Sequence, residues 1–259
     1  MPNLKQIESL RNKYNIGSVS NSSINIRHIK ALNESFNKSS YQIKSFFSSR
    51  GLSSHILEYL EEQKSAEVIL LFIDITDFSQ KCESLTNTQL SEFLDDYYDK
   101  VIPVIYRHGG EIEKIIGDGI ICLFGEPFCS ASKSELFKKA DQCAKDIIVK
   151  LKNTSKEVKI AFHDGKIMYY KNKSEDYSEY TMIGKPMTEL FRLESVSENN
   201  TINFFHISLY DKMEVSKEGV YKVSDSNQHS YWKKSDSIKV DLKGVNWSFI
   251  KKFTCTYKT

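Results

Sequence analysis

Apolar residues follow two alternating patterns along the chain from about residue 54 onward. The run VILLFIDI at residues 68–75 is an almost unbroken β-branched and apolar segment, typical of a central strand buried on both faces. Thr86, with Gln89 three residues later, has the form of a capping box. The apolar residues that follow recur at helical spacing until Pro103, which we expect to kink or end the helix. The pattern predicts a buried strand followed by an amphipathic helix.

Two strand-like runs in residues 111–125 flank the turn sequence Gly117-Asp118-Gly119, which predicts a β-hairpin. A second amphipathic helix is expected over about residues 134–151, and a strand over residues 158–170. After a polar stretch at residues 172–179, YTMIG predicts a strand and MTELFRLES a helix. Further strands are expected around GVYKV and within SIKVDLKGVNWSFIKKF. This order predicts an α+β fold with a ferredoxin-like βαββαβ sheet, helices packed on one face and extra C-terminal strands.

The first 50 residues are different in kind, because they are rich in Ser and Asn, carry more basic than acidic residues and contain only short apolar patches. We expect residues 1–64 to form a polar, partly helical arm. Within it, residues 54–63 predict a short helix with Ile56, Leu57 and Leu60 on one side. The arm leads into one domain at residues 66–257.

Composition narrows the class of partner. The net charge of +2 over 259 residues gives no overall field for nucleic acid or a membrane surface. The longest apolar run is far too short to cross a bilayer and the start of the chain lacks the apolar segment of a signal peptide, so we expect a cytoplasmic protein with no membrane partner. Five cysteines, without a CxxC pair, are expected to be buried reduced thiols.

Two aspartates are candidates for chemistry. Asp74 ends the most apolar stretch of the chain, where a carboxylate is costly unless a cation or hydrogen-bond donors compensate it. Asp118 lies in the hairpin turn, and the intervening helix can bring that turn beside the first strand. The two carboxylates and the carbonyl of Ile75 would suit Mg²⁺ or Mn²⁺. The alternatives are that Asp118 is only a turn residue and that Asp74 caps the next helix.

Five blocks occur in a familiar order: LFIDITDFS, GGEIEKIIGDGIICLFGEP, HDGKI, YTMIGKPMTELFRLES and VDLKGV. Together they resemble the motif set of the class III nucleotidyl cyclases over about residues 67–253. The resemblance implies a head-to-tail homodimer with active sites between the protomers, where a nucleoside triphosphate closes to its 3′,5′-cyclic monophosphate and releases pyrophosphate. It further implies that Asp74, the Ile75 carbonyl and Asp118 bind two divalent ions, Mn²⁺ or Mg²⁺, per site.

The same resemblance implies two catalytic residues on one helix. Arg192 matches the arginine that the family places near the α-phosphate, where its cationic fork can stabilise growing negative charge. Thr188 stands where the family often has an Asn that orients the ribose. Without the motif, Arg192 would be expected to form a surface ion pair with Glu189 or Glu194.

Three further residues are candidates for nucleotide binding. Lys114 and Thr181 match the two base-selecting positions of the family. Strand alternation is expected to put Lys114 on the same face as Ile112. Phe72 lies two residues before Asp74, hence on the same face, and either contacts the nucleotide or belongs to the core.

The pair of Lys114 and Thr181 argues against GTP and leaves ATP and the pyrimidine triphosphates open. The chain shows no receptor or regulatory segment, and with its motif spelling it resembles the stand-alone bacterial pyrimidine cyclases of Pycsar antiphage defence. We therefore favour UTP as substrate, with cUMP acting on a separate effector. The alternatives are a soluble adenylate cyclase making cAMP and an inactive cyclase-homology module that binds a nucleotide. Retention of both aspartates and Arg192 argues against the last.

Overall fold

The structure is a computed structural model that describes residues 4–14, 54–171, 180–223 and 228–256. These residues belong to two compact units, one from Met1–Ser65 with Met168–Ile183 and one from Ala66–Ile167 with Gly184–Thr259. The expected polar loop at residues 172–179, and residues 15–53 of the expected arm, lie outside the described residues.

In its described residues, the smaller unit contains two helices and one short strand pair. Helices α1 (Leu4–Lys13) and α4 (Ser54–Glu61) belong to it. The end of strand β4 (Val158–Lys171) pairs antiparallel with β5 (Tyr180–Ile183). Helix α4 confirms the helix expected at residues 54–63, and Ile56 and Leu60 are buried as its apolar pattern predicts.

The larger unit is built on one mixed sheet. Its central strands follow the order β2-β3-β1-β4-β6-β10-β8-β7, and β9 pairs with β10. The strands are β1 (Ser65–Ile75), β2 (Glu111–Ile116), β3 (Gly119–Gly125), β4 (Val158–Lys171), β6 (Thr201–Phe205), β7 (Gly219–Lys222), β8 (His229–Lys234), β9 (Ile238–Lys239) and β10 (Phe249–Thr256). The helices are α5 (Phe78–Glu83), α6 (Asn87–Arg107), α7 (Lys133–Leu151), α8 (Lys185–Glu194) and α9 (Leu209–Lys212), with a 3₁₀ turn at Glu214–Ser216.

The order β2-β3-β1-β4 with helices α6 and α7 is the expected ferredoxin-like core. Strand β6 was not predicted. Its five residues, TINFF, are all buried, and it pairs parallel with β4 and antiparallel with β10. It therefore joins the C-terminal strands to the same sheet as the core.

Local signals define the two long helices. Thr86 and Gln89 form the predicted capping box of α6, and Ser132 with Glu135 forms another at the start of α7. Pro103 does not end α6, which continues to Arg107. Most residues after Pro103 are buried, so their packing maintains the helix although the proline lacks a backbone donor.

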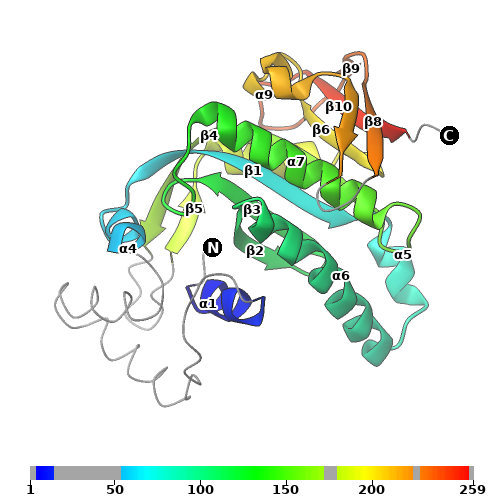
Figure 1. The fold of residues 1–259 in the computed structure, drawn as a ribbon, viewed down its shortest axis with the longest axis horizontal. Helices are drawn as coiled ribbons and strands as arrows, with labels where there is room; N and C mark the ends of the chain where they lie inside the picture. Colours follow the sequence, from blue (N-terminus) through cyan, green and yellow to red (C-terminus); the bar gives the residue numbers. More distant parts are fainter. Residues whose placement is uncertain (1–3, 15–53, 172–179, 224–227, 257–259) are drawn as a thin grey trace. The chain divides into compact units, whose positions relative to one another are not determined.

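The helices cover both faces of the sheet. Figure 1 shows α6 and α7 side by side on the near face of the sheet. Helix α7 contacts β3. At this contact, burial and the neighbouring thiol of Cys122 on β3 raise the pKa of Cys143 on α7. Cys122 is in register with Leu71. The next residue, Phe72, faces the opposite side, and its ring contacts Phe191 of α8 with centroids 5.2 Å apart. The expectation of helices on a single face is thus correct for α6 and α7 and wrong for α8.

All five cysteines are free, as expected. Four are buried, but Cys82, on the short helix α5, is half-buried. That helix buries none of its residues, which is why the expected burial is wrong at this position.

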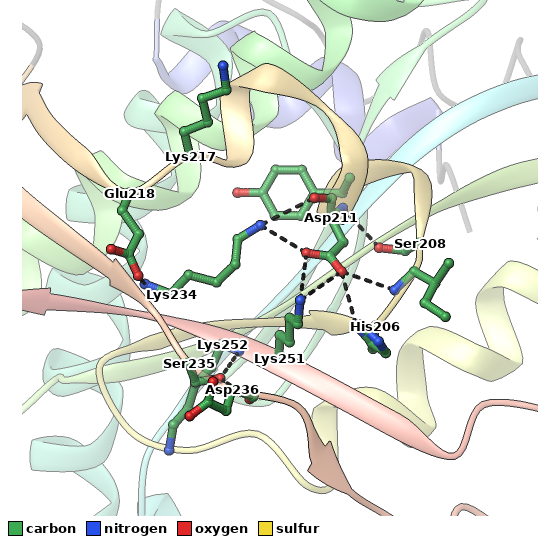
Figure 2. A network of polar contacts seen from close by, with 12 residues as sticks. His206, Ser208, Asp211, Lys217, Glu218, Lys234, Ser235, Asp236, Lys251 and Lys252 are labelled. Atoms are coloured by element: carbon green, nitrogen blue, oxygen red, sulfur yellow. Dashed lines mark hydrogen bonds and ion pairs between the residues drawn. The ribbon is translucent and has the colours of Figure 1, made fainter.

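An ion network around Asp211 ties the C-terminal strands together (Figure 2). Its carboxylate lies 2.9 Å from Nζ of Lys234 on β8 and 3.3 Å from Nζ of Lys251 on β10, and 3.2 Å from Nδ1 of His206. Burial alone would raise the pKa of Asp211, but hydrogen bonds from Lys234, the backbone of Ile207 and Lys251 lower it to about 2. The ionised form of this aspartate therefore stabilises the fold.

None of the helices in the described ranges combines the length and the apolar character needed to cross a membrane.

Candidate active site

The structure brings Asp74 and Asp118 together. Asp74 is the second-last residue of β1, and Asp118 lies in the turn between β2 and β3. Because β3 runs antiparallel to β1, with Ile120 opposite Ile73, the turn lies beside the end of β1. A hydrogen bond joins the two carboxyl groups, and Asp118 also forms a hydrogen bond with the backbone of Ile75. The two carboxyl groups and the residue Ile75 are therefore neighbours, and ligation by the Ile75 carbonyl stays a prediction.

The two carboxyl groups perturb each other. Burial, followed by the charge of Asp118, raises the pKa of Asp74 to about 6, although the nearby ammonium of Lys159 acts in the opposite direction. Burial also raises the pKa of Asp118, against its hydrogen bonds. Two ionised carboxylates this close repel each other, and a cation between them would remove the repulsion.

This donor set fits a divalent cation. Carboxylate and carbonyl oxygens are the ligands that Mg²⁺ and Mn²⁺ prefer. No group of three or more His, Cys, Asp or Glu side chains suited to a metal gathers within the described ranges, so the remaining ligands would be backbone carbonyls, water or substrate oxygens. Asp74 does not cap a helix, because Asp77 precedes α5 and Thr86 caps α6.

Two charged residues of this site were not expected there from the sequence, because Lys159 was not singled out and Glu194 was considered only as an ion-pair partner of Arg192. Lys159 on β4 places its Nζ 3.4 Å from Oδ2 of Asp74 and 2.7 Å from Oε1 of Glu194, at the end of α8. The available signal was a lone lysine in the otherwise apolar start of β4, VKIAF. Nothing local in that signal indicated which carboxylates it would meet.

Helix α8 presents Thr188 and Arg192 on one exposed face, four residues apart. The alternative of an ion pair between Arg192 and Glu189 or Glu194 is wrong. Glu194 instead pairs with Lys159. Glu189 is buried and takes contacts from His163, Lys185 and Trp247. The guanidinium of Arg192 is thus not engaged by the carboxylates of its own helix.

Lys114 is exposed on β2, but the expected alternation is wrong there. A β-bulge lies between Ile112 and Lys114, so Ile112 pairs with Cys122 while Lys114 pairs with Ile121. Ile112 and Lys114 therefore face opposite sides of the sheet. Since Ile121 is in turn opposite Phe72, the bulge places Lys114 on the face that carries Phe72 and Asp74.

The remaining candidates for nucleotide binding are Phe72 and Thr181. Phe72 is only 7% exposed, and its ring packs against Phe191 and beside Gly119, where an added Cβ would lie 2.7 Å from the ring. The ring of Phe72 is thus part of the buried layer on this face of the sheet, and its contact with a nucleotide stays a prediction. Thr181, in the smaller unit, is half-buried in β5 opposite Tyr170.

Comparisons with known proteins identify the class. Residues 60–239 match the family described as the adenylate and guanylate cyclase catalytic domain. The match covers more than half of the chain, and the chain belongs to this family. The expected class III nucleotidyl cyclase fold is thereby confirmed.

Individual relatives are distant. An uncharacterized protein of Mycobacterium tuberculosis, Rv1319c, is 26% identical over 144 residues, which are 54% of this chain and 25% of that protein. The chain thus spans about a quarter of the length of this curated relative.

Solved structures agree in fold. The adenylyl cyclase CyaB from P. aeruginosa superimposes with a TM-score of 0.60 at 19% identity, covering 75% of this chain and 97% of CyaB. A guanylyl cyclase domain from the fungus Blastocladiella emersonii, described as a non-canonical dimer, gives a TM-score of 0.57 at 17% identity, covering 75% of this chain and 99% of that domain.

Proposed function

We propose that this domain is an active nucleotidyl cyclase that converts a nucleoside triphosphate into its 3′,5′-cyclic monophosphate and pyrophosphate. The observation that carries the proposal is the pairing of Asp74 with Asp118 at the end of β1, beside the backbone of Ile75. A module that only bound a nucleotide would not need two mutually repelling carboxylates, which cost stability unless a cation joins them.

The reaction forms one bond and breaks another. The ribose 3′-oxygen attacks the α-phosphorus, the bond from that phosphorus to the bridging oxygen breaks, and pyrophosphate leaves while the hydroxyl proton is released. Divalent ions, Mn²⁺ or Mg²⁺ and two per site, would acidify the hydroxyl and neutralise the triphosphate. Asp74, Asp118 and the Ile75 carbonyl would hold them. Arg192 would stabilise charge at the α-phosphate, and Thr188 would orient the ribose.

The site requires a homodimer. Thr188 and Arg192 share an exposed face of α8, and Arg192 has no carboxylate partner on its own helix. A second copy of the chain would bring that face to the metal carboxylates of the first. The cyclase domain from B. emersonii forms a dimer, described as non-canonical, and so supports association of two copies without specifying this arrangement.

The base is proposed to be uracil. Lys114 is exposed and lies on the face of Phe72, so its ammonium can donate to a base carbonyl. The cytosine 4-amino group would meet the same cation unfavourably. ATP is the second candidate, supported by the likeness to CyaB, with Lys114 and Thr181 then contacting adenine.

The proposed setting is that of the Pycsar cyclases. There the cyclic nucleotide would act as an antiphage signal on a separate cytoplasmic effector, with residues 66–257 as the catalytic domain and residues 1–64 as its arm. The resemblance of the chain's motif sequences to those of the Pycsar pyrimidine cyclases supports this role.

Product identification tests the proposal. The purified full chain is incubated with ATP, GTP, CTP or UTP and Mn²⁺, and the products are identified by mass spectrometry. Asp74→Ala and Asp118→Ala should each abolish cyclic nucleotide formation without loss of folding. The control is Asp96→Asn, which alters an exposed aspartate paired with Lys100 and Lys156. Activity of either alanine variant within a few fold of wild type would refute the site.

A further inference from the structure

Lys159 is shared between two carboxylates from different elements. Its Nζ lies 2.7 Å from Oε1 of Glu194 and 3.4 Å from Oδ2 of Asp74. The three side chains are mostly shielded, with exposed fractions of 21%, 15% and 20% for Lys159, Glu194 and Asp74. Asp74 and Glu194 also interact through a hydrogen bond. Shielding strengthens such contacts relative to an ordinary surface ion pair.

Within one chain, the cluster joins the metal-binding carboxylate of Asp74 to the helix α8, which carries Arg192. Asp74 is the second-last residue of β1 and Lys159 the second residue of β4, and these are neighbouring strands. Glu194 is the last residue of α8, two positions after Arg192. An intact helical turn is stiff, so the position of Glu194 fixes the position of Arg192.

We propose that Lys159 is a positioning residue that anchors α8, and with it Thr188 and Arg192, to the metal-binding carboxylate of Asp74. This inference rests on the proposed cyclase function and adds a dependence to it. Lys159 competes with a metal ion for Asp74, whereas Glu194 draws Lys159 away from Asp74. In a homodimer with two sites, the anchor would also connect the carboxylate of one site to the arginine that serves the other.

Two substitutions should therefore have opposite effects on metal binding. Lys159→Gln removes the competing cation, so the full chain should bind Mn²⁺ about three- to ten-fold more tightly. Glu194→Gln leaves Lys159 to Asp74 alone, so Mn²⁺ should bind about three- to ten-fold more weakly. The affinities are measured by isothermal titration calorimetry without nucleotide at pH 8, above the pKa of Asp74 at about 6.

The same two substitutions should have the same effect on turnover. Both release the end of α8, so kcat should fall about ten-fold or more while KM changes less. Lys159→Arg keeps the cation and should restore kcat to within about three-fold of wild type. Lys100→Gln, which removes an exposed lysine paired with Asp96, should change neither quantity.

Shifts of Mn²⁺ affinity in the same direction for both variants would overturn the proposal, as would a wild-type kcat in Glu194→Gln. If Lys159→Gln does not fold, weaker Mn²⁺ binding together with reduced kcat in Glu194→Gln supports the anchor, and any other result overturns it. Failure of the cyclase function is distinguishable, because the wild type would then form no cyclic nucleotide, while opposite shifts in Mn²⁺ affinity would still demonstrate the shared lysine.

Discussion

Substituting Asp118 by Asn should stabilise the metal-free protein and at the same time remove its response to metal. The introduced amide keeps an oxygen that can accept the hydrogen bond at the Ile75 backbone, but it removes the charge that repels Asp74. The rise in the pKa of Asp74 from 3.8 to about 6 corresponds to about 3 kcal/mol between its two protonation states. Burial is the larger cause and solvent screens the remainder, so the part due to Asp118 is roughly 1 kcal/mol.

The sign of the pH dependence follows from the direction of this shift. A raised pKa means that the folded protein binds the proton of Asp74 more tightly than the unfolded chain does. This contribution to stability is therefore complete below about pH 4 and is lost as the pH rises through about 6. At pH 7.5 the metal-free wild type carries the full cost of the repulsion, and Asp118→Asn does not.

Urea denaturation at pH 7.5 measures both effects. In EDTA, Asp118→Asn should be more stable than wild type by roughly 1 kcal/mol. With Mn²⁺ in excess, wild type should gain stability as expected for a ligand of the folded state, and the variant should gain much less. The control Asp96→Asn should follow wild type in its response to Mn²⁺. A variant that is less stable than wild type in EDTA, or that gains as much from Mn²⁺, would refute the reasoning.

Three other predictions concern the dimer, the base and the C-terminal sheet. Mixing inactive Asp74→Ala with inactive Arg192→Ala chains should restore cyclase activity through heterodimers that hold one intact site, and no recovery despite demonstrated subunit exchange would contradict sites shared between protomers. Competition assays with UTP and CTP should show a preference of about ten-fold or more for UTP, which Lys114→Ala reduces more than it reduces Mn²⁺ binding; ATP as the best wild-type substrate would replace the uracil proposal. Because the pKa of Asp211 is lowered to about 2, its stabilisation is present above about pH 4 and is lost as the pH falls through about 2, so Asp211→Asn should cost about 1 kcal/mol at pH 7 and much less at pH 2 in denaturation measurements.

Local sequence signals predicted the elements that depend on neighbouring residues. The buried run of β1, the glycine turn after β2 and the capping box at Thr86 each involve a few consecutive positions, and each is present in the structure. The same signals were sufficient to place Asp74 and Asp118 at the ends of adjacent strands. Their pairing follows from the topology of the core, which the order of elements indicates.

Contacts between distant segments were not accessible in this way. Strand β6 is only five residues long and is defined by its neighbours β4 and β10, not by its own alternation. Lys159 meets Glu194 because α8 ends beside β4, which no spacing along the chain specifies. Pro103 does not end its helix, because tertiary packing of the buried residues after it prevails over propensity, and a kink at Pro103 stays a prediction.

Because of the β-bulge before Lys114, the sheet face assigned to this lysine by simple alternation depends on which end of β2 the alternation is counted from. The extra residue of the bulge shifts the alternation of side chains between the two faces by one position, so the two halves of β2 alternate out of step with each other. Counting by twos from Ile112 leads to the wrong face, whereas the pairing on the side of the hairpin turn leads to the face of Phe72. A related chain without the extra residue would present the same position with one residue fewer before it. In comparisons among such chains, the position of Lys114, which we propose contacts the base, should therefore be located by its distance from the hairpin turn and not from the start of the strand.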